Sequence, residues 1–154
     1  MPFAVPLFAN VYNAEFGANV PSGEKQGDAG AGWAKATAAG AATVLGPAPS
    51  SAISAAESAM AGMLAGWNSD NDNAGMMLKN GLVTFAATMA PGFAPSAAIP
   101  PAGPPPIDSV FSVGDAGADA LTMGNQFGAI LASWFPTGTY IIPGAPPIGP
   151  LPWS

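Results

Sequence analysis

The C-terminal stretch from Ala120 to Ser154 contains no side chain that is charged at neutral pH. An apolar, helix-like pattern continues as far as Phe135, and a proline-rich tail then ends in Leu151-Pro152-Trp153-Ser154. Contiguous apolar surface of this length is rarely left exposed to water by a soluble monomer. The stretch therefore needs a cover, and the sequence leaves three open: the rest of the chain, a partner chain, or lipid.

Charged side chains are scarce along the whole chain. They make up 8% of the residues, against the usual quarter or so, while 49% are hydrophobic. The only cations are Lys25, Lys35 and Lys79, and the formal net charge is −6. Because binding to phosphates depends on cations that displace counterions, we expect no nucleic-acid partner.

The chain contains neither histidine nor cysteine. This excludes the Ser–His and Cys–His nucleophile systems and removes the usual ligands of zinc. We therefore expect no enzymatic activity, no cofactor and no metal. A disulfide framework is excluded as well.

Two groups of acidic residues are candidate sites. Asp108, Asp115 and Asp119 precede a predicted helix, where negative charge is favoured by the helix dipole, and this explains them better than acid–base catalysis. The run 68–73 alternates acids with amides but lacks the glycine and acid spacing of a calcium-binding loop. We interpret it as a loop between helices.

The pattern of apolar residues predicts a mainly α protein, a small packing of three to four helices with long proline- and glycine-rich irregular arms. We expect a single domain, 1–154. Its predicted segments are an N-terminal arm (1–27), a helical part (28–90), a proline-rich linker (91–112), a C-terminal helix (113–136) and a proline-rich tail (137–154).

Within these segments, glycine, proline and capping residues mark the helix ends. The linker holds seven prolines within 91–107, which predicts extended, polyproline-like backbone. A short helix near 7–16 and a short strand within 137–142 are alternatives to irregular structure. The predicted helices span about 29–45, 50–67, 74–90 and 115–135.

Small residues recur every four positions in two of the predicted helices, which indicates close helix packing. Gly124-x-x-x-Gly128 also matches a membrane helix-dimer motif, so a lipid-facing role stays open. Trp153, beside the end of the tail, is the best candidate for docking into a neighbour. The interface candidates are Gly62, Gly66, Gly124, Gly128, Trp134 and Trp153.

The charge-free runs 80–107 and 120–154 are both long enough to span a bilayer. Clustered prolines interrupt both runs, and no basic residues flank them to set an orientation. A membrane contact is therefore disfavoured. The N-terminus lacks the positively charged region of a secretion signal, so we expect no secretion signal.

The segment Ile142-Pro143-Gly144-Ala145-Pro146-Pro147-Ile148-Gly149-Pro150, in a chain without histidine or cysteine, resembles minor virion proteins of tailed phages, of the tail and baseplate type. The resemblance is one of overall composition and assigns no functional residue. It implies a virion location and a structural subunit that bridges other protein subunits in a homo- or hetero-oligomeric assembly. The alternatives are a small helical membrane-inserted protein and a soluble binding module for an apolar ligand.

Overall fold

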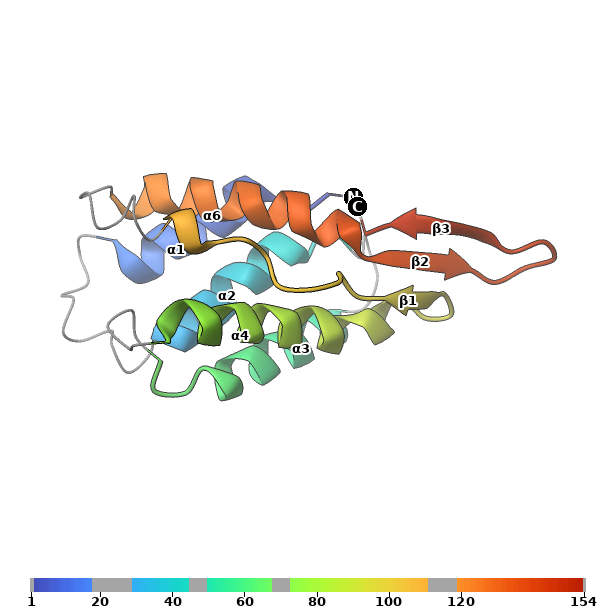
Figure 1. Cartoon of the computed structure of the whole chain (residues 1–154), viewed down its shortest axis with the longest axis horizontal. Coiled ribbons are helices and arrows are strands. Elements are labelled where there is room, and N and C mark those ends of the chain that lie inside the picture. Colours follow the sequence, from blue (N-terminus) through green and yellow to red (C-terminus); the bar gives the residue numbers. More distant parts are fainter. Residues whose placement is uncertain (1, 18–28, 45–49, 68–72, 111–118, 154) are drawn as a thin grey trace.

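Helices form most of the protein, which confirms the prediction of a mainly α fold. The computed structural model describes residues 2–17, 29–44, 50–67, 73–110 and 119–153. A small antiparallel sheet lies at one end of the helical bundle (Figure 1). The long helices of these ranges are α1 (Val5–Phe16), α2 (Ala29–Ala41), α3 (Ser50–Met63), α4 (Ala74–Met89) and α6 (Ala120–Trp134).

Helix α2 lies in the middle of the bundle, between the pair α1/α6 and the pair α3/α4 (Figure 1). Ten of its thirteen residues are buried, nearly all of them alanine or glycine. A Cβ atom at Gly30 would lie only 2.4 Å from the carbonyl oxygen of Leu64, and one at Gly40 would overlap the ring of Phe3. The small side chains therefore allow neighbouring elements to approach α2 closely from both sides, as the alanine-rich sequence predicts.

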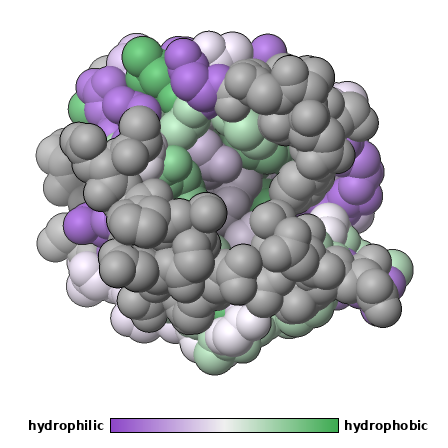
Figure 2. All heavy atoms as spheres, turned by 90° about the vertical axis from the view of Figure 1, so that its left-hand side faces the viewer, coloured by the Kyte–Doolittle hydropathy of each residue, from purple (hydrophilic) through white to green (hydrophobic). Residues whose placement is uncertain are grey.

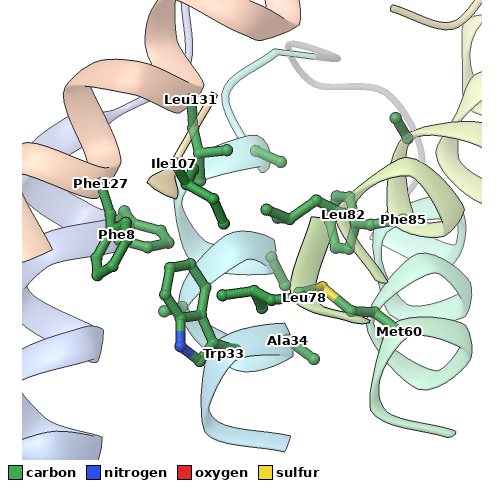
Figure 3. Close-up of a cluster of buried hydrophobic side chains, with 14 of the residues drawn as sticks. Phe8, Trp33, Ala34, Met60, Leu78, Leu82, Phe85, Ile107, Phe127 and Leu131 are labelled. Carbon is green, nitrogen blue, oxygen red and sulfur yellow. The ribbon is translucent and has the colours of Figure 1, made fainter. Parts of the chain in front are cut away.

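Each long helix contributes large side chains to one continuous core (Figure 3). Phe8 of α1, Trp33 of α2 and Phe127 of α6 meet on one side, and the ring centroids of Trp33 and Phe127 are 4.6 Å apart. Met60 of α3 and Leu82 of α4 fill the other side. At the end of the bundle opposite the sheet, by contrast, hydrophilic and hydrophobic residues of the described part are interspersed on the surface (Figure 2).

The expected N-terminal arm is wrong for residues 5–16, which form α1. Pro6 lies in the first turn of this helix, where a missing N–H and a fixed φ are tolerated. Phe8, Tyr12 and Phe16 follow at intervals of four residues and point toward the bundle, so burial of this stripe stabilises the helix. The short helix considered as an alternative is thus present, and residues 18–27 of the arm lie outside the described part.

The linker and the tail contain strands where irregular backbone was expected. The linker forms the 3₁₀ helix η1 (Ala90–Phe93) and strand β1 (Ala97–Ile99). The tail forms β2 (Thr139–Ile142) and β3 (Ile148–Pro152), which confirms the strand considered near 137–142. The strand order is β1-β2-β3, and the hairpin of β2 and β3 projects beyond the bundle (Figure 1).

Helix boundaries agree closely with the predictions where the stop signals are strong. Helix α3 ends at Met63, earlier than predicted, because a turn leads to Gly66 in the left-handed region at φ 76°. Helix α6 begins at Ala120, where the side chain of Asp119 accepts a 2.7 Å hydrogen bond from the N–H of Thr122. The earlier start predicted near Asp115 lies outside the described residues. A 3₁₀ turn, η2 (Phe135–Thr137), links α6 to β2.

Candidate functional site

The two charge-free runs of the sequence come together at the sheet end of the molecule. Strand β1 belongs to the run 80–107, and β2 and β3 belong to the run 120–154. The sheet therefore carries no side chain that is charged at neutral pH. The charged side chains of the described residues lie elsewhere, on the helices or beside them: Glu15, Lys35, Glu57, Lys79, Asp108 and Asp119.

The β2–β3 hairpin is the most exposed apolar feature of this end. Every residue from 141 to 150 is exposed, and the exposed fractions of Ile142 and Ile148 are 37% and 57%. These two isoleucines are partners across the hairpin, so their side chains form one apolar patch near its tip. Gly149, at φ 127°, adopts a conformation that side chains disfavour and accompanies the irregular pairing beside it.

The base of the hairpin is fixed to the bundle by Trp153. Its side chain is fully buried, and its Nε1 donates a 3.0 Å hydrogen bond to the carbonyl oxygen of Thr139. Phe93 of η1 lies between Trp153 and Tyr140, with ring centroids 4.8 and 5.0 Å away. Because this cluster links η1, β2 and the end of β3, it holds the exposed part of the hairpin in one direction.

An apolar groove of about 450 Å³ lies close to the hairpin base, between α6 and the linker. The linker is held against α6 by a 3.0 Å hydrogen bond from Nε1 of Trp134 to the carbonyl oxygen of Gly103. None of the described residues that line this groove has an ionisable side chain. Its lining residues are Pro106, Ala129, Ile130, Ser133, Trp134 and Thr137.

The predicted small-residue ridge of α6 packs inside the chain. A Cβ atom at Gly124 would lie 3.1 Å from the Cα of Ala9, and one at Gly128 would lie 2.9 Å from Cγ1 of Val5. Both glycines therefore allow α1 to approach α6. The tight packing that the spacing predicts is present, but the neighbour is a helix of the same chain.

The ridge of α3 has no such neighbour in the described part of the chain. Gly62 and Gly66 are exposed, and a Cβ atom at either position would meet nothing within 4 Å. The ridge is therefore not used for close packing among the described residues, and its role as an interface with another subunit stays a prediction. Gly66 instead supplies the left-handed conformation that follows α3.

The two candidate tryptophans are both buried by their own chain. Trp134 is 5% exposed and is one of the residues that line the groove, and Trp153 is fully buried at the hairpin base. Trp153 is thus not a protruding anchor that enters a neighbour, as the sequence suggested. The large apolar side chains that the hairpin exposes are instead its isoleucines, which an apolar pair followed by a glycine- and proline-rich turn could have indicated.

The same described residues bear on metal binding, acid–base chemistry and membrane spanning. Across the described ranges, no three acidic residues come together in a way that could hold a metal ion. Burial raises the pKa of the Tyr12 hydroxyl well above its ordinary value, but this residue lies within the core. Of the helices described, none combines the length and the apolar character needed to cross a membrane.

Comparison with protein families, curated proteins and solved structures finds no match to this chain.

Proposed function

We propose that the protein is a structural subunit of a larger protein assembly and that its β2–β3 hairpin bridges to a neighbouring subunit. The observation that carries this proposal is the exposed, uncharged hairpin that projects beyond the bundle (Figure 1). Exposed apolar patches of this kind mark protein interaction sites. Because Trp153 fixes the hairpin base, a neighbour can bind the tip with little loss of conformational entropy.

The assembly we propose is a phage virion, with the protein in its tail or baseplate. Support comes from the proline-rich segment 142–150, which carries the resemblance to minor virion proteins and is the segment exposed on the hairpin. A subunit surrounded by neighbours has little need of charged surface, in keeping with 8% charged residues. The neighbours are copies of this chain, other virion proteins, or both.

Light scattering after gel filtration, without detergent, tests whether the chain assembles through the hairpin. The wild-type chain should give a discrete oligomer, and Ile148→Lys should dissociate it because a charge would be buried in the contact. Met76→Lys is the matched control, since Met76 is 63% exposed but lies on α4.

A wild-type chain that stays a compact monomer over the whole accessible concentration range would contradict assembly of this chain with itself. Equal dissociation by Ile148→Lys and Met76→Lys would show that the hairpin has no special part in assembly.

A further inference from the structure

At the sheet end of the part of the chain that the structure describes, two apolar surfaces lie uncovered, and they differ in shape. One is the hairpin tip, residues 142–148, which is convex and exposed throughout. The other is the groove of about 450 Å³ along α6, which is concave. An occupant of the groove must be apolar and uncharged to match its lining, and the tip has this character.

The tip cannot enter the groove of its own chain. Thr137 lines the groove, and β2 begins two residues later at Thr139 and leads away from the bundle. Strands advance about 3.3 Å per residue, which places Pro143 roughly 13 Å beyond Thr139. Pairing on both sides of β2, including Ala97 with Ile141, fixes this direction.

We infer that the groove binds the hairpin tip of a second copy of this chain, in a two-fold dimer in which each tip lies in the groove of the other copy. The inference rests on the proposed assembly role and names the contact by which two copies join. Proline-rich segments dock into grooves lined by aromatic residues, and here Pro143, Pro146 and Pro147 would meet a groove that Trp134 helps to line.

The distribution of charge favours a second copy over a charged partner. Each copy carries a net charge of −6, so two copies repel unless their ionisable side chains stay apart. Neither tip nor groove carries a charge, and Asp108, the acid nearest to the groove in sequence, is paired with Lys79. A contact through these surfaces therefore buries no ion and keeps the charged helices at a distance.

The size of the contact explains why we infer a reciprocal arrangement. A single contact would join the seven residues of one tip to the six lining residues of one groove. Stable interfaces use about 20–30 residues on each side, so one contact alone is small. Two-fold symmetry lets both contacts form at once, with the exposed sheet residues Ile99 and Ile141 between them.

Cysteine-specific crosslinking tests the contact directly, because the chain has no native cysteine. A tagged Ala145→Cys chain is mixed with an untagged Ser133→Cys chain and treated with a short bis-maleimide. We expect at least about tenfold more crosslinked heterodimer than with Ser58→Cys, since docking raises the local concentration of the two thiols. Ala145, Ser133 and the control Ser58 are all exposed, so the substitutions leave the core intact.

A second variant closes the groove without touching the core. Ala129→Arg should weaken dimerisation at least about tenfold in light-scattering titrations, because a long charged side chain would fill a small apolar site. Ala55→Arg, at an exposed position of α3, is the control and should leave the dimer unchanged. Equal dimerisation of Ala129→Arg and wild type would overturn the inference.

The remaining outcomes separate this inference from the proposed function. An oligomeric wild type that gives mainly Ala145→Cys homodimer shows a tip-to-tip contact, which refutes the inference and leaves the assembly role standing. An oligomer that gives neither the Ala145→Cys homodimer nor the heterodimer of Ala145→Cys with Ser133→Cys also refutes the inference and leaves the assembly role standing. A monomeric wild type refutes the second-copy contact and assembly of the chain with itself together, and a small apolar ligand then becomes the occupant to test.

Discussion

The backbone N–H of Trp153 donates a 2.9 Å hydrogen bond to the carbonyl oxygen of Gly138, and the indole lies directly over the same glycine. A Cβ atom at Gly138 would be 2.7 Å from the indole ring. The penultimate residue of the chain thereby closes the base of the hairpin against the residue that precedes β2. The orientation of the exposed tip depends on this contact.

Removal of the Trp153 indole should loosen the hairpin and destabilise the fold. We expect Trp153→Ala to lower the free energy of unfolding by about 3–5 kcal/mol, the usual cost of truncating a buried tryptophan. Urea unfolding followed by near-ultraviolet circular dichroism measures this change. Met76→Ala, at an exposed position of α4 away from the hairpin, serves as the comparison and should change stability by no more than about 0.5 kcal/mol. Similar losses in both variants would argue against the role of Trp153.

The two glycine ridges should respond to alanine in opposite directions. Gly124→Ala places a methyl group 3.1 Å from the Cα of Ala9, and since backbone cannot move aside easily, we expect a loss of about 1–3 kcal/mol. Gly62→Ala meets nothing within 4 Å, and helix propensity should then stabilise the protein by about 0.5–1 kcal/mol. Chemical denaturation of the two variants, at the protein concentration used for wild type, measures whether each free energy of unfolding rises or falls. A gain in stability from Gly124→Ala is the result that the structure does not allow.

The buried hydroxyl of Tyr12 should make the fold sensitive to alkali. Burial raises its pKa above the ordinary value of 10.0, so above about pH 10 the unfolded chain releases a proton that the folded chain retains. Stability is therefore unaffected below about pH 10 and falls above it, by up to about 1.4 kcal/mol per pH unit. Tyr12→Phe should remove this part of the slope, as shown by urea midpoints measured at about pH 8 and about pH 11. Parallel pH profiles for both proteins would exclude Tyr12 as the cause.

Self-association through an uncharged contact should not weaken as salt is added. The net charge of −6 makes copies repel, and salt screens that repulsion within a Debye length of about 8–10 Å at physiological ionic strength. We therefore expect the dimer fraction to stay constant or rise between low and high sodium chloride, measured by sedimentation. Dissociation by salt would instead indicate ion pairs in the contact.

Local sequence signals predicted the helices better than any other part of the fold. Helix α4 spans Ala74–Met89, within one residue of the prediction, because Leu78, Leu82 and Phe85 form a regular stripe and Pro91 forbids its continuation. The N-terminal helix was only an alternative, since two prolines at its start favour extended backbone just as well. Burial of its aromatic stripe against α2 and α6 decides the outcome, and a local pattern does not contain that contact.

The candidate surface was harder to predict because it depends on contacts between distant residues. The sequence shows two charge-free runs, but their meeting in one sheet depends on the pairing of Ala98 with Tyr140. The spacing of Gly124 and Gly128 predicts a close neighbour without saying whether it belongs to the same chain. Trp153 follows a proline-rich tail, and this position suggests an exposed anchor. Only the fold of the hairpin shows that its side chain is buried.

The packing of α1 against α6 also means that the helical bundle can close only after α6 has been synthesised. About a hundred residues separate these helices, and at about 5–20 residues per second the first helix waits roughly 5–20 s for the last. During this interval the faces of Phe8 and Tyr12 that contact α6 have no cover. The nascent chain therefore passes through a stage in which the aromatic stripe of α1 lacks part of its partner surface, and closure of the bundle is a late step of folding.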